Sequence, residues 1–427
     1  MSIQMIIELA AEKFIHSTSK NMYGTSILSH PYASLIMSGH SEEVQLIQDL
    51  LSCAEQVRNN MYQRATKILH TCHRMSSCTG TPVQRLVFYF TEALYEKIDR
   101  ETGSITTKGL GNKCVDPLEM LKCTDSVLIS FHKKLPISQI TKFVGVQAIV
   151  DHVEESSKVH IIDLEIRCGI QCTILMQALV ERSKSPISSL KITAMGSESN
   201  KTVLLETGRR LAGFAQSLNL NFCFKVVVVA DMLDLRENLF DLDDDEAVAV
   251  YAPYTLTSMI GRTERLEHVM KVIRKLDPCV MILIEMEANC NSPNFVDRFV
   301  EALFFFGAFF DTIADCMKNE EKNRREAEST CFRASIRNVL GAEGGERKVR
   351  HVSIDVWRAY LERFGLVETE LSMSCMYQAK LVLESFRCGS NCELEMNGKC
   401  LTMSWKGTPL TSLSAWKFQR AGEMSNL

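Results

Sequence analysis

The sequence lacks the features that carry a chain onto a membrane or onto nucleic acid by composition alone. Its 48 Lys and Arg residues are outnumbered by 52 Asp and Glu residues, so a net charge of −4 and a pI of about 6.2 provide no global positive field that would attract DNA. The most apolar run, residues 304–310, is far too short to span a bilayer, and we expect a buried helix there. Residues 1–11 have no basic start and contain Glu8, so we expect a short helix there instead of a signal peptide.

The sequence also lacks the short motifs of the commoner enzyme and metal sites. It contains no Gly-x-Ser-x-Gly nucleophile elbow, no His-Glu-x-x-His zinc motif and no phosphate-binding loop. Its 16 cysteines are scattered along the chain without a secretory signal, which indicates reduced thiols in a cytosolic or nuclear compartment. The pair Cys168 and Cys172 and the later group Cys388, Cys392 and Cys400 have neither the CxxC spacing nor the histidine partners of a zinc site, so we predict no metal.

Residues 158–181, KVHIIDLEIRCGIQCTILMQALVE, are the most informative stretch that is present. They open with a β-branched apolar run that ends on Asp163, continue through a short segment with the single glycine Gly169, and adopt helical spacing from Ile174 onward. A near-continuous apolar run of this kind is typical of a central parallel strand that is covered on both faces. The stretch therefore predicts strand, loop and helix.

A ligand site and a structural connection both fit this stretch. An acidic residue at the carboxyl end of a central parallel strand lies where open α/β sheets bind their ligands. A nucleoside or dinucleotide loop, however, needs closely spaced glycines that allow the backbone to approach the ligand, and residues 164–172 contain only Gly169. We favour the alternative, a sheet-to-helix connection in which Asp163 and His160 make buried hydrogen bonds, and we predict no cofactor.

The rest of the chain has helical spacing first and alternating strands and helices afterwards, which predicts a parallel α/β sheet with an N-terminal helical cap. We expect helices at residues 41–57, 63–70, 81–100, 116–131, 202–218, 262–276 and 295–317, with a loop at 102–113. We expect strands at residues 159–163, 190–194, 222–229, 247–251 and 280–285, and antiparallel additions to the sheet edge at 368–371, 379–386 and 400–405. The acidic turn at residues 241–246 is expected to be a solvated loop.

The helix expected at residues 41–57 contains a candidate partner-docking motif. Its segment IQDLL approximates the LxxLL docking pattern, with isoleucine in place of the first leucine. The residues Ile47, Leu50 and Leu51 are therefore candidates for partner docking. An ordinary core face explains the same apolar stripe, and this is the interpretation that we favour.

Two basic clusters are candidates for contacts with DNA phosphates or with the nuclear import machinery. The first consists of Lys322, Arg324 and Arg325 with Arg333 and Arg337, and the second of Arg347, Lys348 and Arg350. The candidate contacts are the first three residues of the first cluster and all three of the second. Glutamates are interleaved with the first cluster, which favours a solvated helix face with salt bridges over a nucleic-acid groove.

The motif Val159, His160, Ile161, Ile162 and Asp163, followed by GIQ and LMQAL, resembles the VHIID signature of the plant GRAS family of transcriptional regulators. VQLIQDLLSCAEQV and FTEALYEKI resemble the first leucine-rich region of that family, and LLETGRRLAGFAQSLNL resembles the second. MEANCNSPNFVDRFVEAL and CLTMSWKGTPLTSLSAW resemble its PFYRE and SAW regions. These segments occur in the family's order, so the resemblance covers nearly the whole chain.

The resemblance implies a short N-terminal segment at 1–40 and a single GRAS domain at 41–418. Its expected parts are a mainly helical cap with the first leucine-rich region (41–150), the VHIID region (125–190), the second leucine-rich region (204–236), the PFYRE region (247–339) and the SAW region (342–417). The implied core is Rossmann-like and similar to methyltransferases. Because residues 1–40 contain no DELLA-type motif, we do not expect hormone-triggered degradation through such a segment.

The function implied by the resemblance is that of a nuclear regulator and not an enzyme. Its expected partners are DNA-binding transcription factors and GRAS relatives in homo- or heterodimers, with weak or partner-dependent DNA binding and no membrane association. One alternative is a transcription factor that itself binds DNA with sequence specificity. A degenerate S-adenosylmethionine-dependent methyltransferase is a further alternative, for which Glu198 is the one candidate ribose ligand. Two departures from the family pattern are Cys172 in place of a tryptophan and FRASI at residues 332–336 in place of FGREI, which removes an arginine–glutamate pair.

Overall fold

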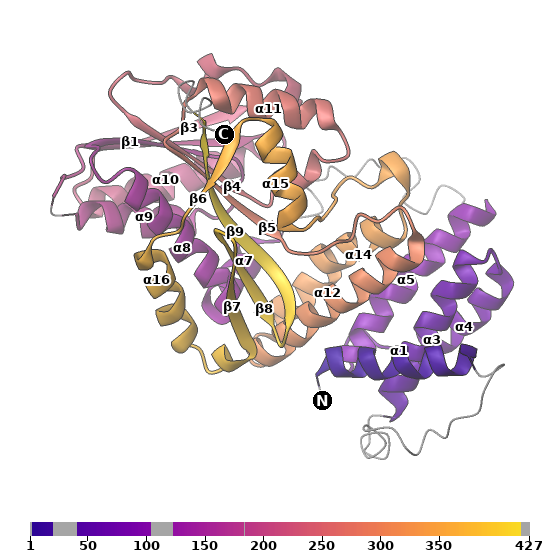
Figure 1. Cartoon of the computed structure of the whole chain (residues 1–427). Helices are drawn as coiled ribbons and strands as arrows, with labels where there is room; N and C mark the ends of the chain where they lie inside the picture. Colours follow the sequence, from indigo (N-terminus) through magenta and orange to yellow (C-terminus); the bar gives the residue numbers. More distant parts are fainter. Residues whose placement is uncertain (1, 20–40, 104–122, 183, 420–427) are drawn as a thin grey trace. The chain divides into compact units, whose positions relative to one another are not determined.

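The chain divides into two units, each assembled from separated segments of the sequence (Figure 1). The computed structural model describes residues 2–19, 41–103, 123–182 and 184–419. Unit 1 comprises Met1–Val127, Ala288–Arg350 and Trp405–Leu410, and unit 2 comprises Leu128–Glu287, His351–Ser404 and Thr411–Leu427. No helix in the described ranges is both long enough and apolar enough to cross a membrane.

A sheet with the strand order β3-β2-β1-β4-β5-β9-β8-β7 forms the centre of unit 2, and β6 pairs with β9. The strands are β1 (Lys158–Asp163), β2 (Ser189–Gly196), β3 (Phe222–Val228), β4 (Ala247–Pro253), β5 (Val280–Met286), β6 (Leu366–Thr369), β7 (Cys392–Asn397), β8 (Cys400–Trp405) and β9 (Thr408–Phe418). Strands β1 to β5 run parallel, whereas β9 runs antiparallel to β5. The predicted parallel sheet with a late antiparallel edge is confirmed.

Strand β1 lies between β2 and β4, as its apolar run predicts. Val159, Ile161 and Ile162 are almost completely buried, because helices cover both faces of a parallel sheet. The core of unit 2 continues through α11 (Thr263–Lys275) and α15 (Ile354–Arg363) to two fully buried tryptophans, Trp357 and Trp416.

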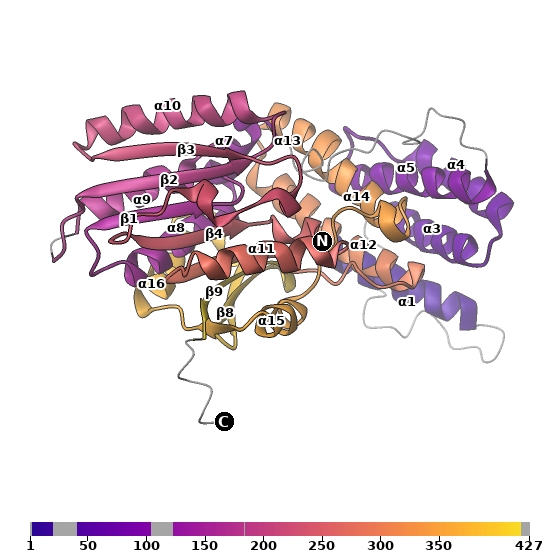
Figure 2. The ribbon, with the colours of Figure 1, turned by 90° about the horizontal axis from the view of Figure 1, so that it is seen from above.

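The helices of unit 2 connect and cover these strands. They are α8 (Pro136–His152), α9 (Ile170–Val180), α10 (Lys201–Ser217), α11 (Thr263–Lys275), α15 (Ile354–Arg363) and α16 (Met373–Glu384), and α7 (Asp125–Lys134) begins in unit 1 and ends in unit 2. Figure 2 shows α10 running along β3. Gly208 permits this approach, since a Cβ atom there would lie 2.2 Å from the ring of Phe224.

Unit 1 is mainly helical in its described parts, and only its segment Trp405–Leu410 belongs to strands β8 and β9 and their turn. Its helices are α1 (Ile3–Ser19), α3 (Ser41–Arg58), α4 (Tyr62–Met75), α5 (Pro82–Thr102), α12 (Phe295–Cys316), α13 (Glu321–Ala327) and α14 (Arg333–Leu340). Helix α3 packs against α1, α4 and α5, and α5 packs against α12 and α14. A π-helical turn, Glu328–Phe332, joins α13 to α14. The predicted helical character of the N-terminal part and of residues 295–317 is correct.

Two predicted elements differ from those in the structure. The strand expected at 379–386 is wrong, because these residues lie mostly in helix α16. The side-chain hydroxyl of Ser372 caps this helix by accepting a hydrogen bond from the backbone N–H of Cys375 at 3.1 Å, and the buried residues follow a helical period. The helix expected at 116–131 begins at Asp125, and residues 116–122 of that prediction, like residues 104–113 of the expected loop, lie outside the described residues.

Candidate functional site

His160 of the VHIID motif is held in a buried network at the start of the central strands. Its Nε2 atom lies 2.8 Å from Oγ1 of Thr193 on β2, and its Nδ1 atom lies 2.7 Å from Oε1 of Glu246. Burial lowers the pKa of His160, although the Glu246 carboxylate opposes this shift. Lys191 also contacts Glu246 at 3.0 Å. The expectation that residues 241–246 form only a solvated loop is therefore wrong for Glu246, whose side chain is buried.

Asp163 ends β1 and fixes the connection to α9. Its carboxylate accepts hydrogen bonds from the backbone N–H of Glu165 at 3.0 Å and from Nε2 of Gln171 at 2.9 Å. Gln171 also donates to the backbone carbonyl of Ile166 at 3.0 Å. Burial raises the pKa of Asp163 to about 7, and the two donors act in the opposite direction. The arrangement is the buried, hydrogen-bonded sheet-to-helix connection that we favoured from the sequence.

The loop between Asp163 and α9 is closed by side chains and not by glycines. Gly169 has a φ of +73° and precedes the first residue of α9, and Arg167 has a φ of +52°. The Arg167 guanidinium stacks on the ring of Tyr254 with a distance of 5.2 Å to the ring centroid. Since bulky side chains occupy the carboxyl ends of β1 and β4, backbone and ligand cannot approach each other here as they do in a glycine-rich cofactor loop.

Other titratable groups near this edge of the sheet also have strongly shifted pKa values. Glu285 is the penultimate residue of β5. Burial raises its pKa well above the usual value, against the effect of nearby backbone N–H groups of Thr257 and Leu256. Burial lowers the pKa of Lys142 on α8 to about 8, and its ammonium donates to the hydroxyl of Ser138 at 2.9 Å. Such groups are typical of functional sites, but buried structural networks shift pKa values in the same way.

The candidate methyltransferase ribose ligand is exposed and already has a neighbouring lysine as its partner. The side chain of Glu198 is 78% exposed, and its carboxylate forms an ion pair with Lys201 at 3.3 Å. Within the described ranges there is also no group of three or more His, Cys, Asp or Glu side chains that could hold a metal ion. In the described residues, Asp163 thus lies where a cofactor would bind, but neither a glycine-rich loop nor a suitably placed acid after the second strand accompanies it to hold a nucleoside.

The first basic cluster is largely used within unit 1. Arg324 donates to the buried carboxylate of Glu328 at 3.1 Å, and Arg325 donates to Glu321 at 2.6 Å. Lys322 is exposed. These ion pairs match the salt-bridged helix face that the interleaved glutamates indicate.

The second basic cluster makes contacts with backbone carbonyls. Arg347 is buried and lies 3.5 Å from the carbonyl of Cys290, and Lys348 donates to the carbonyl of Gly345 at 3.2 Å. Arg350 donates to the carbonyl of Gly344 at 2.7 Å and to the side chain of Asn291 at 3.0 Å. DNA contacts by these six residues remain a prediction, and most of them would have to exchange an internal partner for a phosphate.

The candidate docking residues of α3 lie in the interior of unit 1. Ile47 and Leu50 are fully buried, and Leu51 is 8% exposed. A partner could reach these side chains only if α3 left its neighbouring helices. Docking through them remains a prediction that the burial does not support, and the core interpretation accounts for their apolar stripe.

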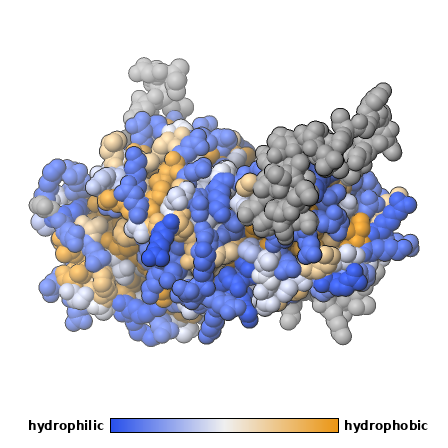
Figure 3. All heavy atoms as spheres, turned by 90° about the horizontal axis from the view of Figure 1, so that it is seen from below, coloured by the Kyte–Doolittle hydropathy of each residue, from blue (hydrophilic) through white to orange (hydrophobic). Residues whose placement is uncertain are grey.

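Sequence reasoning missed the most exposed apolar surface of the described chain. Helix α16 exposes 85% of Met373, 63% of Tyr377 and 43% of Leu381, which follow one another at intervals of four residues. We name these three residues the α16 stripe. The opposite face of α16 is buried against α8 through Cys375, Ala379 and Val382, so the helix is two-sided. The four-residue spacing is readable in the sequence, but the expected strand concealed it. The space-filling view shows apolar side chains gathered between polar ones on the face seen from below (Figure 3).

A comparison with solved structures identifies the class of fold. The crystal structure of SCL7 from Oryza sativa superposes with a TM-score of 0.75 and 26% sequence identity, covering 87% of this chain and 99% of that chain. That match defines a Rossmann-like, methyltransferase-like core of the kind predicted.

The family follows from the sequence comparisons. Residues 46–417 match the GRAS domain family. The chain is 29% identical over 386 residues to DELLA protein GAI1 of Vitis vinifera, covering 90% of this chain and 63% of that protein. It is 27% identical over 391 residues to DELLA protein RGA of Arabidopsis thaliana, covering 91% of this chain and 64% of that protein. The chain belongs to the GRAS domain family of plant transcriptional regulators, and it spans somewhat less than two thirds of the length of these two relatives.

Proposed function

We propose that this GRAS protein acts in the nucleus by binding DNA-binding transcription factors and GRAS relatives, and that it reaches promoters through those factors. The observation that carries the proposal is the α16 stripe. Large apolar side chains that are exposed side by side on a polar surface mark sites of protein contact. The stripe has the four-residue spacing with which one helix presents its side chains to another.

The chemistry of the stripe indicates what kind of surface covers it. A row of Met373, Tyr377 and Leu381 on a convex helix is complementary to the apolar face of a second helix. Lys380 and Glu384 are exposed on the same helix and would select charges of opposite sign at the margins of the partner. We therefore assign the stripe to an amphipathic helix of a DNA-binding partner protein.

Two further observations support contact with proteins over catalysis or autonomous DNA binding. The carboxyl edge of the parallel strands is filled by Arg167, Tyr254 and Gln171, and most of the candidate phosphate-binding residues already have partners within unit 1. With a net charge of −4, the chain has no general attraction for a polyanion that would compensate for these occupied side chains.

The experiment that tests the proposal compares two charged variants of α16. Tyr377→Glu combined with Leu381→Glu places two carboxylates within the stripe, and Ser374→Glu places one on an exposed position beside it. Immobilised wild type and both variants are incubated with plant nuclear extract, and the captured proteins are quantified by mass spectrometry. We expect DNA-binding factors to be recovered by wild type and Ser374→Glu, and at least tenfold less by the double variant.

The control is the thermal unfolding midpoint, which should be equal for the three proteins because all substituted side chains are exposed. Undiminished capture of the same factors by the folded double variant would contradict the assignment of α16. Loss of self-association alone, with the factors still captured, would assign the stripe to a second copy of the chain.

A further inference from the structure

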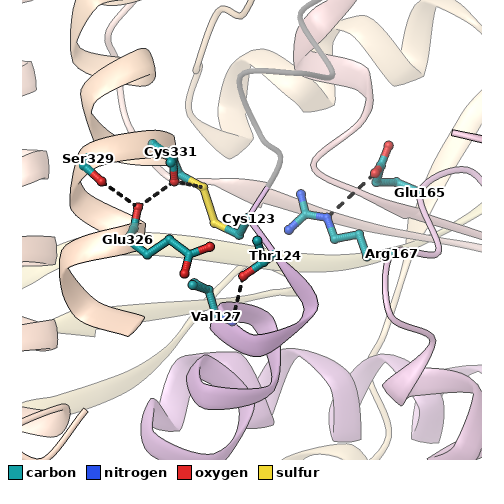
Figure 4. Close-up of a disulfide and its surroundings, with 9 residues drawn as sticks. Cys123, Thr124, Val127, Glu165, Arg167, Glu326, Ser329 and Cys331 are labelled. Atoms are coloured by element: carbon teal, nitrogen blue, oxygen red, sulfur yellow. Dashed lines mark hydrogen bonds and ion pairs between the residues drawn. A yellow bond between two sulfur atoms is a disulfide. The ribbon is translucent and has the colours of Figure 1, made fainter. Parts of the chain in front are cut away.

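Cys123 and Cys331 are joined by a disulfide within unit 1, although the sequence indicates reduced thiols (Figure 4). Their Cα atoms are 6.2 Å apart, within the range that backbones must reach for this bond, while 208 positions separate the residues in the sequence. Cys123 lies two residues before α7, at the end of the first segment of unit 1, and Cys331 lies in the second segment. The fold therefore brings these two thiols together from distant parts of the chain.

The local structure turns Cys331 toward its partner. Cys331 is the fourth residue of the π-helical turn Glu328–Phe332, which interrupts the α-helical path between α13 and α14. Such turns shift the direction of the following side chains and recur at functional sites. The Thr330 hydroxyl lies 3.7 Å from the Cys331 sulfur and donates to the backbone carbonyl of Glu326 at 2.6 Å, which fixes the turn beside the sulfur.

The two cysteines of the pair differ from each other in their access to solvent. Cys123 is partly exposed, whereas Cys331 is 8% exposed. Many of the remaining cysteines in the described ranges are buried and inert, and burial raises the pKa of Cys290 and of Cys72 to about 12. Since only the thiolate reacts readily, these thiols are protected from oxidants. A solvent-accessible thiol next to a second cysteine is the arrangement of a cysteine that reacts with an oxidant and a cysteine that resolves the product into a disulfide.

We propose that Cys123 and Cys331 form a modification site for hydroperoxides, at which the protein is reversibly oxidised from a dithiol to a disulfide. The Cys123 thiolate attacks one peroxide oxygen, the O–O bond breaks, and sulfenic acid and an alcohol or water result. The Cys331 thiol then attacks the Cys123 sulfur, the S–O bond breaks, and water leaves as the S–S bond forms. The cysteines lose two electrons, the peroxide gains them, and a dithiol reductant restores the two thiols.

The bond changes the chain around it in a way that can be measured. Cross-linking residues so distant in sequence removes conformational freedom from the unfolded chain, so unit 1 should resist denaturation better when oxidised. The bond also restrains residues 123–127, the last of unit 1 before the chain enters unit 2. The inference is independent of the partner surface proposed for α16, since it rests on different residues.

The test begins with fully reduced protein that is exposed to a few equivalents of hydrogen peroxide, alkylated, digested and mapped without reduction. Wild type should yield a peptide pair linked through Cys123 and Cys331, with a loss of two alkylatable thiols that dithiothreitol reverses. Cys331→Ser should instead give a dimedone adduct on Cys123, the trapped sulfenic acid. Cys78→Ser, which removes an exposed thiol of the same unit, should form the linked pair like wild type.

Two results would overturn the proposal. The first is that both thiols remain alkylatable at a peroxide dose that oxidises the exposed Cys78. The second is that Cys123 links to another cysteine in folded wild type. A matching readout is the urea midpoint, which should be higher for oxidised than for reduced wild type and unchanged by peroxide in Cys123→Ser.

Discussion

Replacing the buried Arg298 by methionine should destabilise unit 1 far more than replacing an exposed arginine. Arg298 lies on α12 and is fully buried. Its guanidinium donates to the carbonyls of Val339 at 2.8 Å and Ser292 at 2.9 Å, and to the carboxylate of Glu343 at 2.6 Å. Three separated points of the chain therefore depend on one side chain.

The magnitude follows from what the substitution leaves behind. A buried carbonyl that loses its donor costs about 1 to 3 kcal/mol, and a partly buried one costs less. The Val339 carbonyl is buried and the Ser292 carbonyl is partly buried, which gives about 2 to 5 kcal/mol for the two carbonyls. Glu343 is 45% exposed, so water replaces its lost partner and its contribution is below about 1 kcal/mol. Methionine retains most of the apolar contacts and avoids the desolvation of a charge, which offsets part of the loss. We expect a net decrease of about 3 kcal/mol in the free energy of unfolding of unit 1.

The assay is urea unfolding, followed for unit 1 by hydrogen exchange of the α12 and α14 peptides. With a slope of about 2 kcal/mol per M, the midpoint should fall by about 1.5 M. The matched control is Arg325→Met, because Arg325 is 51% exposed and its partner Glu321 is 62% exposed, so the loss should be at most about 1 kcal/mol. Equal midpoints for the two variants would refute the reasoning that the buried arginine organises this unit.

Burial raises the pKa of Asp163 from 3.8 to about 7, so the carboxyl group stays protonated in the folded protein while it ionises in the unfolded chain. Its stabilising contribution is full below pH 3.8 and is lost as the pH rises to about 7. The free energy of unfolding should therefore decrease less between pH 5 and 8 for Asp163→Asn than for wild type. An equal dependence of the unfolding free energy on pH in the two proteins would exclude this carboxyl group as the cause. Gly208→Ala should lower the free energy of unfolding by about 1 to 3 kcal/mol, because the added Cβ overpacks against Phe224. Gly213→Ala lies on the same helix, where a Cβ meets nothing within 4 Å, and should raise the free energy of unfolding by up to about 1 kcal/mol in chemical denaturation. Similar values for the two variants would show that α10 can move away from β3. S-adenosylmethionine should not raise the melting temperature of the protein, since residues 164–172 lack the glycines of a nucleoside loop, and micromolar affinity in calorimetry would contradict this.

The central strand and its neighbours could be predicted because the sequence pattern that determines them is local. The apolar run of β1 has one arrangement that buries it, between two parallel neighbours, and the alternation of strands and helices fixes the class of fold. By contrast, residues 379–386 contain a short apolar run, Leu381 to Leu383, whose period only partly distinguishes strand from helix. The segment forms a helix because Cys375, Ala379 and Val382 then pack against α8. This packing is a tertiary contact, which the local sequence does not reveal.

The partners of the motif residues were less predictable than the motif itself. That His160 and Asp163 make buried hydrogen bonds could be expected from their positions on a covered strand. That Glu246 is the partner of His160 could not, because 86 positions separate the two residues and the acidic turn resembles a solvated loop in composition. The pairing of Cys123 with Cys331 spans 208 positions of the sequence and likewise depends on the folding of unit 1.

The central claim, that this GRAS protein reaches DNA through its partners, is tested most directly by selection from a pool of random duplexes at physiological salt. The selection is made once with the purified chain alone and once with the chain and a DNA-binding factor captured through the α16 stripe. We predict no enriched sequence for the chain alone, weak binding that falls steeply with salt, and an enriched site when the factor is present. A tight, sequence-selective site for the isolated chain, lost when Arg324, Arg325, Lys348 and Arg350 are neutralised together, would contradict the account and identify a transcription factor that binds DNA by itself.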